Sequence, residues 1–243
     1  MIAGRFLGAE ILKTVIVFGA SGSIGQAICA HFKEQEYLVI GVGRNSSSQS
    51  SMVQWSGNAQ GFSADIMRLL SSTKINAVVW AQGMNFNDDI DTFDLHEHLK
   101  MYEANVTYIL STLKVLMESD LLQTNARLCV ISSIWQNIAR QQKLSYCITK
   151  SALQGLVQSL SVDLGKQGKL INAVLPGALD TVMTRANLSR DQISRLESIT
   201  PLGTLPDLTD VTGLVAYLCS PKNTGITGQF IAADRGFSNA RIL

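Results

Sequence analysis

Short apolar runs alternate with amphipathic segments along most of the chain. The runs are rich in valine and isoleucine, which is typical of strands buried on both faces of a parallel sheet. Between them, apolar residues recur at the three-to-four-residue spacing of helices. The predicted strands are residues 13–18, 37–42, 61–64, 75–81, 127–132, 169–175 and 229–233. The predicted helices are residues 24–35, 66–72, 91–100, 103–119, 146–165, 181–200 and 207–219.

This order of elements predicts an α/β protein with a doubly wound Rossmann fold. Seven parallel strands would form one sheet with helices on both faces. A chain of 243 residues fits one such domain, spanning residues 1–243, because α/β domains often reach ~250 residues undivided. The sequence has no internal repeat, and we expect no domain boundary.

A glycine-rich turn, Gly19-Ala-Ser-Gly-Ser-Ile-Gly25, directly follows the first predicted strand and opens a helix. Glycines let backbone N–H groups and the helix N-terminus approach a pyrophosphate closely. A tight turn without a ligand is the alternative, but the position after the first strand favours nucleotide binding. The residues expected to contact phosphate are Gly19, Ser21, Gly22, Ser23, Ile24 and Gly25.

Tyr146 and Lys150 lie one helical turn apart if a helix begins near Leu144. An ammonium near a phenol favours the phenolate, so we expect Lys150 to lower the pKa of Tyr146 toward physiological pH. Such a tyrosine suits proton transfer at an alcohol or carbonyl oxygen. Most pairs with this spacing are ordinary helix surface, so the pair alone is weak.

Charge and cysteine content exclude several classes of protein. The formal net charge of +1 gives no electrostatic reason for a nucleic acid or an anionic membrane as partner. The apolar runs are far shorter than the ~20 residues of a membrane span. The N-terminus lacks a signal-peptide pattern, and the four cysteines are widely spaced without a metal-binding pattern. We therefore expect reduced thiols, no metal site and a cytoplasmic protein.

From about Lys13 to Gly236 the sequence resembles the short-chain dehydrogenase/reductase family. Ser133 precedes Tyr146 by the family's usual interval, and Tyr146 and Lys150 form its Tyr-x-x-x-Lys pair. Asn105 matches the active-site asparagine. The resemblance implies catalytic roles for Asn105, Ser133, Tyr146 and Lys150. It implies cofactor contacts for the glycine turn, the catalytic Tyr146 and Lys150, and further for Asp65, Ile66, Ala81, Gln82, Gly83, Pro176, Gly177 and Thr181.

Several positions depart from the family's motifs. Phe18 replaces the threonine of the glycine turn, and Ser23 replaces its middle glycine. Trp80-Ala-Gln-Gly83 stands where the family has Asn-Asn-Ala-Gly, which brings the polar side chain of Gln82 near the nicotinamide ribose. Arg235 replaces a glycine of the closing motif. These departures bear on cofactor affinity and on a C-terminal or subunit contact rather than on the fold.

The end of the second strand bears on the choice of cofactor. NAD use in this family goes with an acidic residue there, but Gly43 occupies its place and Arg44 follows. A guanidinium can clamp a 2′-phosphate, and Asn45 could add a donor. We therefore expect NADP(H), with NAD(H) the less favoured cofactor. A solvated arginine at a strand end is the alternative.

The resemblance implies hydride transfer between nicotinamide and a carbonyl or alcohol substrate, with Tyr146 as general acid/base. Residues 181–205 would form a lid over the substrate. By analogy, a homodimer or homotetramer would form through the two long helices. Two other functions stay open, a non-catalytic NADP(H)-binding sensor or regulatory relative, and an isomerase, epimerase or dehydratase with retained cofactor.

Overall fold

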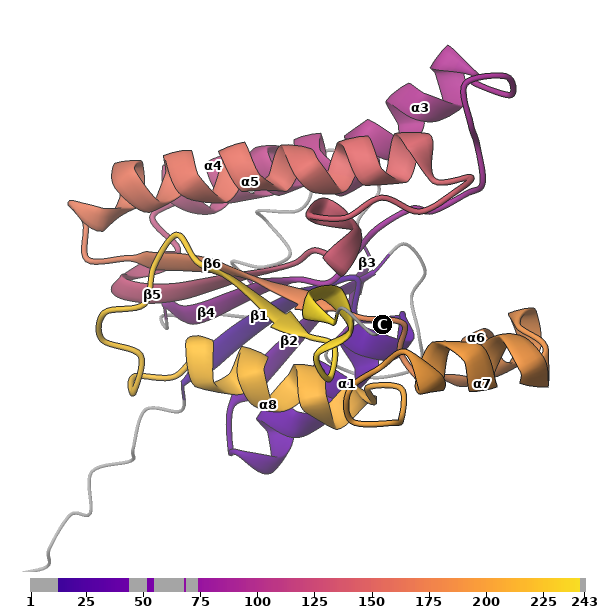
Figure 1. Ribbon diagram of the computed structural model, residues 1–243. Coiled ribbons are helices and arrows are strands. Elements are labelled where there is room, and N and C mark those ends of the chain that lie inside the picture. Colours follow the sequence, from indigo (N-terminus) through magenta and orange to yellow (C-terminus); the bar gives the residue numbers. More distant parts are fainter. Residues whose placement is uncertain (1–12, 44–51, 55–67, 69–73, 241–243) are drawn as a thin grey trace, which may run out of the picture.

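A computed structural model describes residues 13–43, 52–54, 68 and 74–240. A central sheet lies between two layers of helices (Figure 1). The strands are β1 (Thr14–Phe18), β2 (Leu38–Gly43), β3 (Met52–Gln54), β4 (Ile75–Trp80), β5 (Leu122–Ile131), β6 (Leu170–Pro176) and β7 (Phe230–Ala233). They pair in the order β3-β2-β1-β4-β5-β6-β7, and every pairing is parallel. The prediction of a doubly wound Rossmann fold with a seven-stranded parallel sheet is confirmed.

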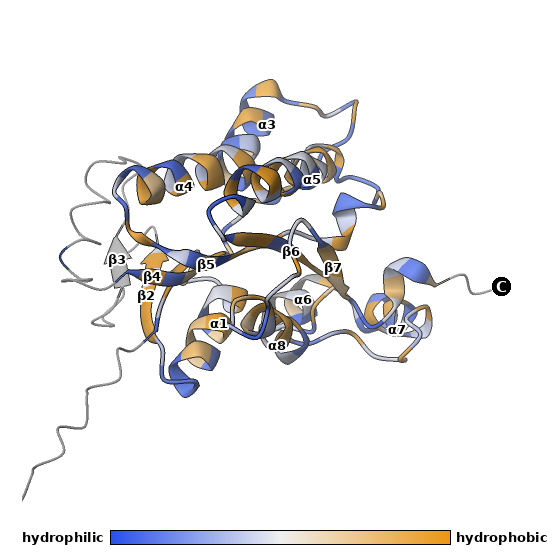
Figure 2. Cartoon of the chain, turned by 90° about the vertical axis from the view of Figure 1, so that its left-hand side faces the viewer, coloured by the Kyte–Doolittle hydropathy of each residue, from blue (hydrophilic) through white to orange (hydrophobic). Residues whose placement is uncertain are grey.

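Helices cover both faces of the sheet. In Figure 1, α1 (Ser23–Glu34) and α8 (Leu208–Leu218) lie on one face, and α4 (Tyr108–Glu118) and α5 (Leu144–Gly165) on the other. Hydrophobic and hydrophilic residues interleave along these helices, as expected for helices with one buried face (Figure 2).

The sheet separates two hydrophobic cores. Successive side chains of a strand point to opposite faces. Ile16 and Phe18 of β1 therefore belong to the core beneath α4 and α5. Val15 and Val17 belong to the core beneath α1 and α8. Both faces of the central strands are buried, which explains why their sequence is mostly apolar.

The structure corrects several predicted elements. β3 was not predicted, and it pairs Met52 with Gly41 of β2. β5 begins at Leu122, five residues before the predicted start. The helix predicted at residue 91 begins at Leu95, because the Asp94 side chain accepts the Glu97 N–H and caps it. Residues 61–64, and residues 66–72 apart from Arg68, lie outside the described residues.

The segment from Leu95 to Glu118 is helical throughout. α3 (Leu95–Tyr102) passes into a π-helical segment, η1 (Glu103–Thr107), and then into α4. Val106, Ile109, Leu113 and Leu116 are buried, but Leu110 is exposed although it lies next to Ile109. The π-helical turn alters the rotation of the helix, so a uniform helical period does not describe the whole segment.

Two short helices, α6 (Val182–Asn187) and α7 (Arg190–Ser198), follow β6 and extend beyond the end of the sheet (Figure 1). They occupy the polar segment expected to be mostly helical. A capping box between Ser189 and Gln192 starts α7. Among the helices that the structure describes, none is long and apolar enough to cross a membrane.

Candidate active site

The carboxyl ends of the central strands meet at one edge of the sheet because all strands are parallel. Phe18 of β1 lies opposite Trp80 of β4, and Trp80 lies opposite Val130 of β5. The glycine turn, residues 81–83 and Ser133 follow these strands, so one edge gathers them. This edge is where ligands bind in open α/β sheets.

At two positions of the turn, other backbone atoms lie so close that only glycine fits. Gly19 has a φ of +74°, and a Cβ there would lie 2.5 Å from the backbone nitrogen of Gln82. A Cβ at Gly25 would overlap the carbonyl oxygen of Gly19. Gly22 precedes α1 and provides no side-chain cap. The first turn of α1 therefore presents backbone N–H groups without intrahelical acceptors, a site suited to an anion.

A cleft of about 890 Å³ opens beside this turn. Six of the predicted cofactor residues line it, namely Gly19, Ser21, Gly22, Ala81, Gln82 and Gly83. The remaining lining residues were not predicted as site residues, and they are Val42, Gly43, Met84, His96, Leu99, Lys100, Glu103, Ala104 and Tyr108. Many of them come from α3 and η1, whose sequence carries no ligand-binding motif.

The other predicted cofactor residues occupy different places. Ser23, Ile24 and Gly25 lie in the first turn of α1 and do not line the cleft. Tyr146, Lys150, Pro176, Gly177 and Thr181 do not line it either. Four predicted cofactor residues lie outside the described residues, namely Arg44, Asn45, Asp65 and Ile66.

A remote carboxylate starts the helix that carries the Tyr-Lys pair. The N-cap residue of α5, Lys143, makes no side-chain capping bond. Instead, buried Asp88 accepts the N–H of Ser145, with Oδ1 at 3.0 Å and Oδ2 at 3.2 Å. The backbone of Asp88 also pairs with Gln142 and Leu144. Asp88 thus fixes the first turn of α5, in which Tyr146 lies.

Ser133, Tyr146 and Lys150 lie together, as the sequence predicted. A hydrogen bond joins the side chains of Ser133 and Tyr146, and the Lys150 Nζ lies 5.7 Å from the centroid of the Tyr146 ring. The Nζ also donates to the carbonyl oxygen of Ile131 at 3.1 Å. Burial lowers the pKa of Lys150 to about 8, because the ammonium has lost its contact with water.

The prediction that Lys150 lowers the pKa of Tyr146 is wrong for this structure. Burial raises the pKa of the Tyr146 phenol, and the hydrogen bond with Ser133 offsets only part of this effect. Desolvation of the phenolate is therefore the largest influence on this pKa. At neutral pH the phenol of Tyr146 therefore keeps its proton.

Asn105 is held rigidly beside this group. It lies in η1, its Oδ1 accepts the N–H of Met84 at 2.7 Å, and its Nδ2 donates to Met84 O and Thr149 Oγ1. A Cβ on Gly83 would lie 3.2 Å from Asn105 Oδ1 and 3.9 Å from Lys150 Nζ. Asn105 therefore connects the segment after β4 with α5, and Gly83 keeps the space between Asn105 and Lys150 open.

The predicted Pro-Gly-x-x-x-Thr segment follows β6. The Gly177 N–H donates to the carbonyl oxygen of Ala233, and a Cβ on Gly177 would lie 2.9 Å from the Cβ of Asp234. Thr181 caps α6 by accepting the Thr184 N–H. Asp180 accepts two hydrogen bonds from Arg185, both at 2.6 Å. These contacts determine how the chain leaves the sheet toward α6 and α7.

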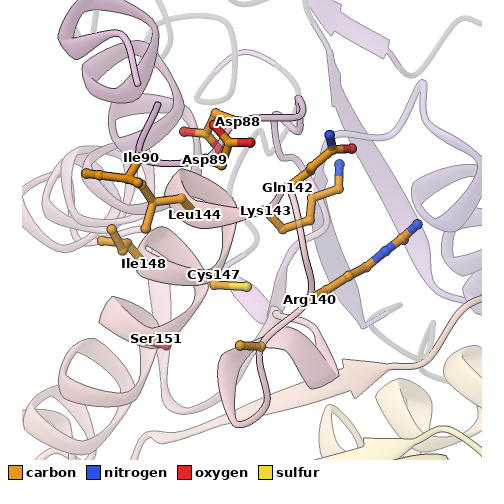
Figure 3. Close-up of a pocket in the computed structure, with 11 residues that line it drawn as sticks. Asp88, Asp89, Ile90, Arg140, Gln142, Lys143, Leu144, Cys147, Ile148 and Ser151 are labelled. Carbon is orange, nitrogen blue, oxygen red and sulfur yellow. The ribbon is translucent and has the colours of Figure 1, made fainter. Parts of the chain in front are cut away.

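A second cavity, of about 510 Å³, lies along a different face of α5 (Figure 3). Leu144, Cys147, Ile148 and Ser151 line it from the helix, together with residues after β4 and before α5. At 100° per residue these positions face away from Tyr146 and Lys150. This cavity is therefore separate from the candidate active site.

Cysteines and metal-binding groups add nothing further to the site. All four cysteines are free, Cys129 and Cys219 are buried, and Cys29 and Cys147 are partly buried. The described residues contain no group of three or more His, Cys, Asp or Glu side chains that could hold a metal ion.

Comparison with known proteins agrees with the fold and the motifs. A family model described as enoyl-(acyl carrier protein) reductase matches residues 19–238. The 3-oxoacyl-[acyl-carrier-protein] reductase of Vibrio cholerae is 26% identical over 239 residues, covering 92% of this chain and 96% of the relative.

Two solved structures share the architecture. Ligand-free aldohexose dehydrogenase of Thermoplasma acidophilum superposes with a TM-score of 0.86 at 22% identity, covering 96% of each chain. A gluconate 5-dehydrogenase from Burkholderia cenocepacia, in complex with NADP and tartrate, gives a TM-score of 0.86 at 18% identity, covering 94% of this chain and 96% of that one. The chain belongs to the short-chain dehydrogenase/reductase family.

Proposed function

We propose that this protein is an NADP-dependent oxidoreductase that interconverts a carbonyl compound and its alcohol. The observation that carries the proposal is the grouping of Ser133, Tyr146 and Lys150 at the sheet edge that also holds the glycine turn. Tyr146 is hydrogen-bonded to Ser133, and the Lys150 Nζ lies 5.7 Å from the centroid of the Tyr146 ring. Proton transfer at oxygen and binding of a dinucleotide are both required for such a reaction.

In the direction of reduction, Tyr146 gives its proton to the substrate oxygen. When bound, the nicotinamide supplies the hydride. Ser133 donates a hydrogen bond to the same oxygen and stabilises the charge that develops there. The ammonium of Lys150 supports the phenolate that remains. Asn105 keeps Met84 and α5 in place, and a water beside it would return a proton to Lys150.

The residues of the cleft fit a dinucleotide. Gly19 and Gly25 leave no room for a side chain, and the N-terminus of α1 suits a pyrophosphate. Gln82 contributes a buried oxygen that lacks a donor among the described residues. The preference for NADP rests on the sequence at Arg44 and Asn45, and the Burkholderia relative, solved with NADP, supports it. Asp65 and Ile66 would contact the adenine end.

The substrate would enter beneath a lid formed by residues 181–205. The Asp180–Arg185 pair and the cap at Thr181 support this proposal, because they set the direction of α6. The named relatives act on 3-oxoacyl groups and on sugars or sugar acids, so the substrate class is a small carbonyl or alcohol compound.

We further propose a homodimer or homotetramer that forms through α4 and α5. Exposed apolar side chains on these helices support it, namely Leu110, Ile148 and Val162. A monomer at micromolar concentration in analytical ultracentrifugation would contradict this assembly.

The test of the function is oxidation of NADPH and NADH in the presence of a panel of carbonyl compounds that includes 3-oxoacyl thioesters and sugar-derived ketones. We expect turnover, with NADPH preferred at least about tenfold over NADH. The Arg44→Asp variant should reverse this preference. Binding of NADPH without turnover on any member of the panel would favour a sensor instead.

A further inference from the structure

Gln82 places a polar side chain in the cleft, where the fold does not require one. It lies two residues after the end of β4, at the position where the Asn-Asn-Ala-Gly motif has alanine. Its Nε2 lies 3.5 Å from the carbonyl oxygen of Ala104, at the limit of a hydrogen bond. Its Oε1 is buried and has no hydrogen-bond partner among the residues that the structure describes.

A buried acceptor without a donor is unfavourable, because it has lost water and gained nothing in exchange. Within the described residues, one other buried side-chain atom shares this state, the Oγ1 of Thr14. Thr14 begins β1 and so lies at the opposite edge of the sheet. Gln82 lines the cleft itself. The last torsion of glutamine is broad, so its amide can turn at little cost.

The neighbours of Gln82 show which part of a dinucleotide would reach it. On one side the backbone of Gln82 lies against Gly19, in the turn suited to the pyrophosphate. On the other side Gly83 adjoins Asn105 and Lys150, next to the Tyr146 group. A dinucleotide spanning these points has a ribose between its pyrophosphate and its nicotinamide. The hydrogen-bond donors of that ribose are its hydroxyl groups.

We propose that Gln82 positions the cofactor by accepting a hydrogen bond from a ribose hydroxyl through Oε1. This inference rests on the proposed function, because it requires NADP(H) in the cleft. Among the described residues no donor reaches this oxygen, and a bound cofactor would supply one. Gln82 therefore destabilises the unliganded protein and stabilises the complex with the cofactor.

Because these two effects have opposite signs, the test measures both cofactor binding and the stability of the unliganded protein. We would measure the dissociation constant for NADPH and the melting temperature of the unliganded protein for wild type, Gln82→Met and Gln82→Ala. Methionine has a similar length but no strong acceptor. We expect NADPH to bind about 5- to 10-fold more weakly to both variants. The melting temperature of the unliganded variants should equal or exceed that of wild type.

Thr14→Val is the matched control, because it removes the other unpartnered oxygen far from the cleft. We expect a melting temperature at or above wild type and an unchanged dissociation constant for NADPH. An unchanged dissociation constant in Gln82→Met would overturn the inference, and so would a lower melting temperature of both unliganded Gln82 variants. If wild type and Thr14→Val both fail to bind NADPH, the proposed function itself is wrong.

Discussion

Asp88 accepts the backbone N–H of Ser145 from 57 residues away, and so caps the helix that carries Tyr146 and Lys150. Both carboxylate oxygens take part, and the side chain is almost fully buried. A residue outside every recognisable motif thereby sets the first turn of α5 and the position of the phenol.

We therefore expect Asp88→Ala to lower the free energy of unfolding by about 1–2 kcal/mol, the usual cost of losing a cap. The turnover number should fall while NADPH affinity stays near wild type, because Tyr146 shifts and the cleft does not. Denaturation with urea and steady-state kinetics check this. Asp88→Asn should keep most of the wild-type stability and turnover number, since asparagine caps a helix as well as aspartate does. Asp91→Ala, which removes an exposed carboxylate of the same loop, should change neither quantity.

Phe18 and Trp80, two departures from the family motifs, form one stacked pair. They lie opposite each other on β1 and β4 with ring centroids 5.8 Å apart and planes 4° apart. Trp80 also donates to Thr112 Oγ1. The two replaced positions are therefore in direct contact.

A double-mutant cycle with Phe18→Leu and Trp80→Leu should give a coupling energy of about 0.5–1.5 kcal/mol in urea denaturation. Phe32 lies in the core on the opposite face of the sheet, so a cycle of Phe18→Leu with Phe32→Leu should be additive. Additivity in the first cycle would mean that the stacking contributes nothing beyond separate burial.

The buried ammonium of Lys150 should make stability depend on pH. Burial depresses its pKa to about 8, below the unfolded value of about 10.5, so the unfolded state binds more protons between these values. Stability of wild type should therefore rise with pH through this window. Lys150→Met lacks this contribution.

We expect the stability of Lys150→Met relative to wild type to fall by about 2 kcal/mol between about pH 7 and pH 9.5. Urea denaturation at both pH values measures it, and the other titrations cancel in the difference. A constant difference would show that the folded protein does not depress the pKa of Lys150.

Arg235 occupies a left-handed conformation, with a φ of +54°, at the position of a family glycine. Its guanidinium pairs with Asp207 and Asp210 and bonds to Thr204. Arg235→Ala should be less stable than Arg235→Gly by about 1 kcal/mol, because both variants lose the ion pairs but only alanine remains strained in the left-handed conformation. Thermal denaturation of the two variants compares them directly. Equal melting temperatures would contradict the assigned strain.

The sequence allowed the fold to be predicted wherever local patterns and motifs agreed. Buried strands such as β4 are mostly apolar, and the glycines at 19 and 25 are required by backbone contact, so both leave a clear signal. The grouping of Ser133, Tyr146 and Lys150 followed from their spacing within a known family. These features depend on residues close in sequence or on the order of parallel strands.

Other features depend on contacts between distant segments and left no such signal. The short strand β3 is paired to β2 but lacks a long apolar run. The cap from Asp88 and the cleft wall from α3 and η1 arise only once the chain is folded. The direction of the Tyr146 pKa depends on how much water reaches the phenol, and spacing alone does not report that.

The central claim is that Tyr146 transfers the proton that accompanies hydride transfer. The most direct measurement compares wild type, Tyr146→Phe and the control Tyr217→Phe, an exposed tyrosine of α8, for NADPH binding and for turnover of a carbonyl substrate. We predict that Tyr146→Phe loses on the order of a thousandfold in kcat, within the range of general acid catalysis, and binds NADPH within about twofold of wild type. Tyr217→Phe should match wild type in both. Turnover by Tyr146→Phe within tenfold of wild type would contradict the account.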